Sequence, residues 1–314
     1  MPDLNVGGQA VIEGVMMRSA DRVATAVRRA SGEIEIQSND FVSLTKRKKF
    51  MGLPIIRGAV SLFEMLVIGI RTLNYSASVA AEDIDKAEGK EPNNKSNNFM
   101  LGVSAVIAFA LGIGIFFFLP LLFSQLAGVK KEALWFNLIA GAIRAAMFLA
   151  YVWALSKFSE FRRVFEYHGA EHKSIFAYES GEDLVAENAV KYTRLHPRCG
   201  TSFILIVVLL AILTYSISDT IFYLITGYPP ALLTRFGIHL LLLPLVAGVS
   251  YELLKLSGKT RDNKLTQIMI QPGLWLQKIT TQEPDLSQLE VAMAALRSSL
   301  GMEAAAKAEA KKAK

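Results

Sequence analysis

The residues able to bind a metal ion are concentrated in one segment of the chain. Of four histidines and one cysteine in 314 residues, His168, His172, His196 and Cys199 fall within a single stretch between apolar runs. His168 and His172 are four positions apart, so a helix would place both imidazoles on the same side. Imidazole and thiolate are ligands that Zn²⁺ prefers. The sequence therefore predicts that these four side chains bind Zn²⁺ or a similar divalent transition metal.

Glu171 lies between the two helical histidines and is the predicted catalytic residue. The order His-x-x-Glu-His over residues 168–172 is that of the inverted zinc-peptidase motif, in which the glutamate activates a water molecule. That motif normally has a distant glutamate as its third ligand. Glu187 or Glu252 could serve, and the sequence selects neither.

Three functions are compatible with this segment. If two histidines and one further residue bind the metal, the open position would serve a hydrolase acting on a membrane-adjacent peptide or lipid bond. If all four side chains bind it, the site would be structural, and the protein would be a membrane-protein assembly or scaffolding factor. Without a metal, Cys199 at a helix start, assisted by His196, would be a nucleophile.

Composition indicates a membrane protein. Apolar residues make up 52% of the chain and its mean hydropathy is +0.34, which is high for a soluble protein. The net charge of +6 is explained first by membrane topology and anionic lipid, which argues against nucleic acid as a partner. The expected partners are the lipid bilayer and other membrane proteins or a second copy of the chain.

A membrane domain is predicted over residues 99–258. It contains four apolar runs near the twenty residues that cross a bilayer. They are Phe99 to Phe123, Ala133 to Leu155, Ser202 to Ile225, and Leu233 to Leu256. The run Leu53 to Leu73 carries Arg57, Glu64 and Arg71, so it is predicted to be an interfacial or re-entrant helix rather than a span.

The distribution of Lys and Arg predicts the topology. The segment 157–201 carries seven basic residues, whereas the loops predicted on the other side carry few, such as Lys130 and Lys131. Basic loops stay in the cytosol. The sequence thus predicts a multi-pass protein of the cytoplasmic (inner) membrane, with both termini and the metal segment in the cytosol.

Two charges inside the predicted spans need partners. Arg144 and Asp219 lie in the second and third spans at depths that differ by roughly 7 Å of helix rise, so they are predicted to pair, because an unpaired charge there is costly. They could also line a transport path. Transport ranks behind the hydrolase and the assembly factor.

The N-terminal region 1–50 is predicted to form a small antiparallel β-sheet of about three strands. Gln9 to Met17 is one expected strand, and Val23 to Val27 with Ile34 to Ile36 form a hairpin around Gly32. Glu13, inside the first strand, would face solvent or turn inward toward a cation, either a metal ion or an arginine. The polar residues 81–98 are predicted to be a flexible linker within the region 51–98.

The C-terminal region 259–314 is predicted to lie first on the membrane surface, where Trp275 suits the interface, and then to form a cytosolic amphipathic helix. A capping box of Ser287 and Glu290 would begin that helix. Its apolar seam should dock on the N-terminal sheet or a partner, and residues 304–314 form a solvated tail. The seam consists of Leu286, Leu289, Met293, Leu296 and Leu300.

Four motifs occur along the chain: GGQAVIEGVMMR (7–18), YHGAEHKSI (167–175), HPRCGTSF (196–203) and ITTQEPDLSQLEVAMAAL (279–296). Together they resemble the YqhQ-like family of bacterial membrane proteins, and the resemblance covers nearly the whole chain. The resemblance implies a multi-span inner-membrane protein that is sometimes labelled as a predicted metal-dependent enzyme. It implies no substrate.

Overall fold

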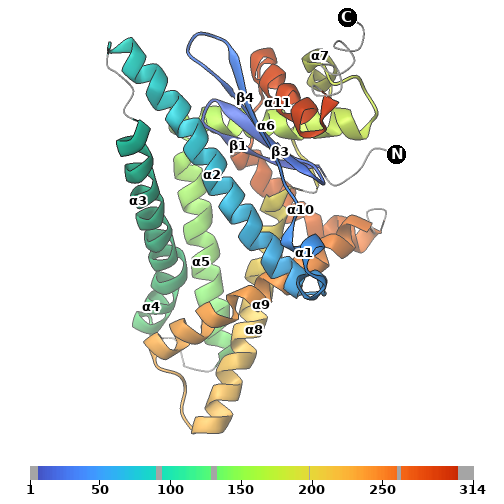
Figure 1. Cartoon of the computed structure of the whole chain (residues 1–314). Coiled ribbons are helices and arrows are strands. Elements are labelled where there is room, and N and C mark those ends of the chain that lie inside the picture. The colour runs from blue at the N-terminus through green and yellow to red at the C-terminus, as the bar shows by residue number, and fades with distance from the viewer. Residues whose placement is uncertain (1–5, 90–93, 129–132, 198, 260–262, 303–314) are drawn as a thin grey trace, which may run out of the picture.

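The computed structural model of the chain describes residues 6–89, 94–128, 133–197, 199–259 and 263–302. It consists of a layered α/β part and a group of long apolar helices that extends away from it (Figure 1). The predicted outer-loop residues Lys130 and Lys131 lie outside the described residues, and so do Arg198 and the predicted tail 304–314.

The N-terminal sheet has four antiparallel strands in the order β1-β2-β3-β4. The strands are β1 (Gly7–Val11), β2 (Gly14–Arg18), β3 (Arg22–Arg28) and β4 (Ile34–Asp40). The prediction of one strand over Gln9 to Met17 is wrong, because a tight turn at Ile12 and Glu13 divides it into β1 and β2. Glu13 adopts a φ of 51° there, a conformation that no sequence rule assigns to glutamate. The β3–β4 hairpin is confirmed, with Gly32 at a φ of 88°.

Helices cover both faces of the sheet. On one face lies α2 (Ile56–Ala87), and on the other lie α6 (Ser159–Glu179) and α11 (Leu286–Ser299). The short helix α7 (Ala186–Val190) packs against α6 and α11. Neighbouring strand residues alternate between these layers: Met16 packs with Ile68 of α2, whereas Met17 belongs to the core that includes Tyr167 and Leu289. This coverage gives a small sheet the buried surface that it needs.

The terminal helix α11 docks on the sheet, as its apolar seam predicts. Leu289, Met293 and Leu296 are fully buried in the main core. The predicted capping box is wrong by two positions, because Asp285 caps the helix and Gln288 returns the hydrogen bond. The first seam residue, Leu286, is exposed.

The predicted linker over residues 81–98 is wrong at both ends. Helix α2 continues to Ala87, and its last turns are held to the sheet because Arg29 forms ion pairs with Glu82 and Asp83. Helix α3 begins at Asn94, so the linker narrows to residues 88–93, of which 90–93 lie outside the described residues. A short helix α1 (Leu44–Arg47) and a 3₁₀ turn η1 (Lys49–Gly52) precede α2.

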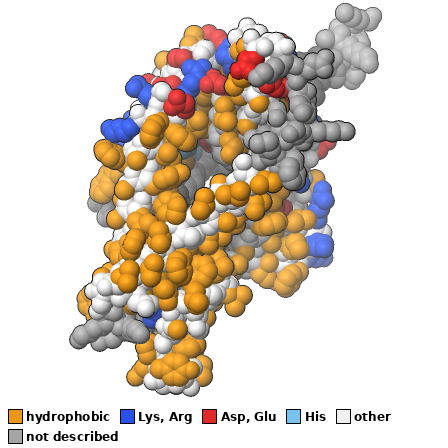
Figure 2. All heavy atoms as spheres, turned by 90° about the vertical axis from the view of Figure 1, so that its left-hand side faces the viewer, with side chains coloured by type: hydrophobic (Ala, Val, Ile, Leu, Met, Phe, Trp, Pro, Cys, Tyr) orange, Lys and Arg blue, Asp and Glu red, His pale blue; other side chains and the backbone are white. Residues whose placement is uncertain are grey.

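Four segments among the described residues are long and apolar enough to cross a membrane, as predicted: Gly102–Leu126, Leu134–Leu155, Ile206–Thr226 and Leu232–Leu256. Figure 2 shows apolar side chains over most of one face, with charged ones near the top and a further group of Lys and Arg at the right-hand edge. The elements are α3 (Asn94–Ile113), a π-helical turn η2 (Gly114–Phe118), α4 (Leu119–Leu126), α5 (Ala133–Leu155), α8 (Gly200–Thr226) and α9 (Leu232–Lys259).

Helix α10 (Lys264–Thr280) connects the candidate spans to the layered part. It packs against α8, and near its end Leu276 and Gln277 are buried while Trp275 is 61% exposed. The location of this helix on the membrane surface stays a prediction. Its last residues lead directly to the cluster of metal-binding side chains.

Candidate metal centre

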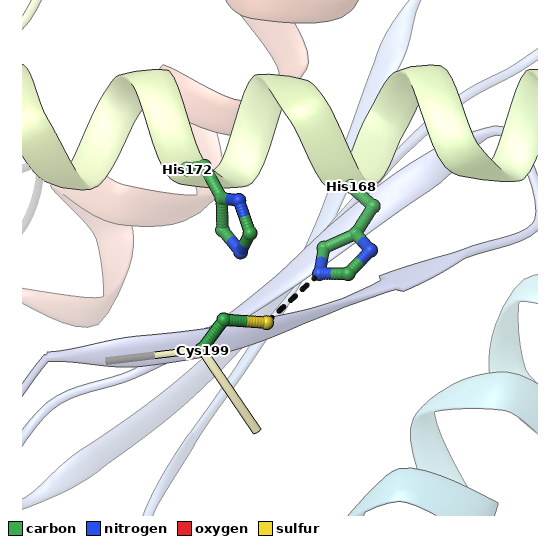
Figure 3. Close-up of side chains that lie close together, drawn as sticks. All are labelled: His168, His172 and Cys199. Carbon is green, nitrogen blue, oxygen red and sulfur yellow. Dashed lines mark hydrogen bonds between the residues drawn. The ribbon is translucent and has the colours of Figure 1, made fainter. Parts of the chain in front are cut away.

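Three of the predicted metal ligands lie together. His168 and His172 project from the same side of α6 toward Cys199, which is the N-cap residue of α8 (Figure 3). One ligand atom from each lies within 4.8 Å of the others, and the Cys199 Sγ is 3.4 Å from the His168 Nε2. In a tetrahedral zinc site, sulfur and nitrogen ligands are separated by about 3.6 Å. The Cys199–His168 pair is already close to this separation, and the other pairs fit a metal ion after a contraction of at most about 1 Å.

Backbone carbonyls orient both imidazoles. The His168 Nδ1 donates to the carbonyl of Thr280 at 2.8 Å, and the His172 Nδ1 donates to that of Arg194 at 2.5 Å. A ring whose Nδ1 carries the proton has its lone pair on Nε2. Both histidines are thus held in the tautomer that can ligate a metal through Nε2, the usual arrangement behind metal-binding histidines.

His172 is prepared to act as a ligand. It is 1% exposed, and its Nε2 is buried without a hydrogen bond to the described residues. Burial lowers the pKa of His172, and the neighbouring thiol of Cys199 opposes this only in part. A neutral imidazole with an unused lone pair is what a metal ion requires.

The two carbonyls are themselves held in place by close contacts. A Cβ on Gly169 would lie 2.1 Å from the carbonyl oxygen of Gln282, so only glycine allows α6 to approach the segment that follows α10. The backbone N–H of Gln282 donates to Phe165 at 2.8 Å. The Arg194 guanidinium donates to Thr281. These contacts fix the positions of the carbonyls that orient the histidines.

His196, the fourth predicted ligand, is not part of the cluster. Its Nε2 lies 3.5 Å from a carboxylate oxygen of Glu179, and its ring packs against Phe176. Its backbone is held by Gln277, which accepts from the N–H and donates to the carbonyl. The structure thus brings together three of the four predicted ligands.

Glu171, the predicted catalytic residue, lies beside the cluster and not in it. Its side chain is 6% exposed and packs against the backbone of Gly8 in β1, where a Cβ would lie 3.0 Å from the Glu171 Cγ. Burial raises the pKa of this carboxyl, while His168, His196 and the Gly8 N–H act in the opposite direction. Neither distant candidate joins the cluster, since Glu252 pairs with Arg57 and Glu187 lies exposed on α7.

Glu13 faces an arginine, which was one of its two predicted inward alternatives. Its carboxylate forms an ion pair with Arg163 of α6 and accepts a hydrogen bond from Tyr167 at 3.4 Å. Because Glu13 occupies the β1–β2 turn, this pair attaches the hairpin to the helix that carries the histidines.

The predicted pairing of Arg144 with Asp219 is wrong. Asp219 instead binds Arg235 at 2.8 Å, His239 at 3.2 Å and the amide of Asn137 at 2.8 Å. The Arg144 guanidinium donates to the carbonyl of Phe116 and stacks on Phe117. The signal for this network was available in the sequence, because Arg235 and His239 are four apart and so share one helical face.

Fold and sequence define this protein as a helical membrane protein with a layered part built on a four-stranded sheet. Residues 53–302 match the family described as "Protein of unknown function (DUF1385)". The chain is 32% identical to "Uncharacterized protein YqhQ" of Bacillus subtilis (strain 168), over 95% of this chain and 93% of that protein. It therefore belongs to this family, and the resemblance seen in its motifs is confirmed. No solved structure matches the chain.

Proposed function

We propose that this chain is a multi-pass protein of the cytoplasmic membrane that binds one Zn²⁺-type ion through His168, His172 and Cys199. Both termini and this site would face the cytosol. The observation that best supports the metal site is the proximity of a thiol to two histidines whose Nε2 atoms are selected by backbone carbonyls. Two nitrogens and one sulfur form a ligand set that suits Zn²⁺.

We further propose that the protein is a hydrolase acting on a peptide or lipid bond next to the membrane. Catalytic zinc sites keep three protein ligands and an open position, and the metal acts there as a Lewis acid that makes water a stronger acid. Glu171, one helical turn from His168, would accept the proton. His196 would remain outside the ligand set and support the segment that precedes Cys199.

A structural metal site in an assembly or scaffolding factor is the second candidate. It is favoured by the origin of the ligands, since two come from α6 in the layered part and the third is the N-cap of α8, the helix that contains the candidate span Ile206–Thr226. A metal there would connect the two parts of the protein.

Metal analysis of the purified full-length protein, prepared without chelator, tests the shared premise. The expected content is about one equivalent of transition metal, lost in His172→Ala and Cys199→Ser and kept in His196→Ala. Less than about a tenth of an equivalent in the unaltered protein would refute both candidates. Loss in His196→Ala, with the fold intact by circular dichroism, would refute the three-ligand site.

Cobalt substitution separates the two candidates. An open position should bind added azide or acetohydroxamate and change the visible spectrum of the Co²⁺ protein, whereas a filled structural site should not respond. Glu171→Gln should keep both the metal and this response, because the carboxylate lies beside the ligands. An unresponsive spectrum would exclude the hydrolase and leave the structural role.

A further inference from the structure

The basic segment before α2 is held against that helix by a buried glutamate. Glu64 is 6% exposed in an otherwise apolar helix. Its carboxylate accepts hydrogen bonds from the Ser43 hydroxyl at 2.7 Å and from the Leu44 N–H at 2.6 Å. Ser43 is the N-cap of α1. A buried carboxylate therefore holds the start of α1 firmly against α2, which is the reason for a charge at this position.

The segment held in this way presents positive charge to the outside. Lys46, Arg47, Lys48 and Lys49 are consecutive and all exposed. Lys46 is engaged by Asp21 at 3.1 Å, and the other three form no ion pair with a described residue. Phe50, which follows directly, is 68% exposed. Three available cations beside an exposed aromatic ring form a surface complementary to an anion with an apolar neighbour.

Contacts with α9 place this surface near one end of a candidate span. The backbone at Ile55 packs against Gly248, where a Cβ would lie 2.3 Å from the Ile55 carbonyl, and Arg57 pairs with Glu252. The candidate span on α9 ends at Leu256. Residues 248–252 are about 6–12 Å from that end along the helix axis, and the basic segment precedes the part of α2 that contacts them.

We propose that Arg47, Lys48, Lys49 and Phe50 form a binding site for the phosphate headgroup of an anionic phospholipid, held in shape by Glu64. The site is separate from the metal centre, and it does not depend on the proposed hydrolase function. Basic residues on the cytosolic side of a span commonly determine only the membrane topology of the protein. Topology does not require that these residues be held rigidly. The attachment through the buried carboxylate of Glu64 therefore favours a defined binding site.

The test uses the full-length protein in nanodiscs of phosphatidylcholine with a minor fraction of phosphatidylglycerol, and native mass spectrometry to measure which lipid remains bound. The unaltered protein should retain phosphatidylglycerol above its share. Arg47→Gln/Lys48→Gln/Lys49→Gln should lower this preference by about fivefold for each charge at low salt. Lys307→Gln/Lys311→Gln/Lys312→Gln removes the same charge elsewhere and should leave the preference unchanged.

Two further variants test whether the lipid preference depends on the attachment through Glu64 and on the ring of Phe50. Glu64→Gln keeps every basic residue but weakens the attachment, so it should reduce the lipid preference, with far-ultraviolet circular dichroism as the check on folding. Phe50→Ala should reduce it by a smaller factor, and it provides the test if Glu64→Gln does not fold. Equal preference in the basic-segment variant and the unaltered protein, or equal loss in the tail variant, would overturn the proposal.

Discussion

Adding one methyl group at Gly169 should move the backbone carbonyl that orients His168 away from the metal-binding side chains. An alanine Cβ would lie 2.1 Å from the Gln282 carbonyl oxygen, and about 0.9 Å of movement is needed to reach the 3.0 Å that real Cβ atoms respect. Both partners are backbone, so neither can move by a side-chain rotation. Gly169→Ala should therefore push the segment after α10 away from α6.

The expected effect has two parts. Overpacking costs about 1–3 kcal/mol of folding free energy, and loss of the Gln282 to Phe165 hydrogen bond adds about 1 kcal/mol. Against this, alanine is favoured over glycine in a helix by about 0.5–1 kcal/mol, so the net loss should be about 1–3 kcal/mol. The Thr280 carbonyl would move away from His168, which should weaken metal binding by about 10- to 100-fold.

Gly237 provides the matched control. It is also helical, and a Cβ there would meet no atom within 4 Å, so Gly237→Ala should be neutral or slightly stabilising. Chelator competition would measure metal affinity, and thermal unfolding in detergent would measure stability. If Gly169→Ala matched Gly237→Ala in both measurements, the close approach of α6 to Gln282 would be refuted.

Three other substitutions test separate parts of the structure. Asp219→Asn alone should lower the free energy of unfolding by about 3–5 kcal/mol. In double-mutant cycles monitored by unfolding, it should couple more strongly to removal of Arg235 than to removal of Arg144. Equal coupling to the two arginines would contradict the observed network. The Ala30 N–H and the Arg29 guanidinium lower the pKa of Asp83 below its usual 3.8, so its contribution is present above that pH and is lost as the pH falls further. Asp83→Asn should flatten the decline of stability in acid unfolding below about pH 4, and an unchanged slope would contradict this. Glu13→Gln should lower stability by up to about 1 kcal/mol without changing metal content, whereas metal loss would give Glu13 a role at the site.

Sequence periodicity predicts the parts of the fold that depend on apolar pattern. The four spans, the β3–β4 hairpin and the docking of α11 follow from the spacing of buried side chains. Periodicity does not predict local structure that involves polar contacts. Glu13 in the β1–β2 turn pairs with Arg163, and the last turns of α2 are held to the sheet because Arg29 binds Glu82 and Asp83. Such contacts join residues that are far apart in the sequence.

Part of the candidate site was likewise predictable from the sequence, and part of it was not. The spacing of His168 and His172 predicts that their side chains lie together, because a helix fixes that relation. The carbonyls of Thr280 and Arg194 that orient the rings were not predictable, because every residue carries a carbonyl and no side chain marks the ones that are used. The prediction of His196 as a fourth ligand did not take account of Gln277, which lies 81 positions away and holds the backbone at His196.

The origin of the ligands gives a bound metal ion a mechanical consequence. The Cys199 Sγ already lies 3.4 Å from the His168 Nε2, close to the roughly 3.6 Å at which a tetrahedral zinc ion holds nitrogen and sulfur. His168 and His172 belong to α6, whereas Cys199 is the N-cap of α8. A bound ion would therefore hold the beginning of α8 at its present distance from α6. Metal occupancy and the position of α8 should be coupled whether the bound ion is catalytic or structural.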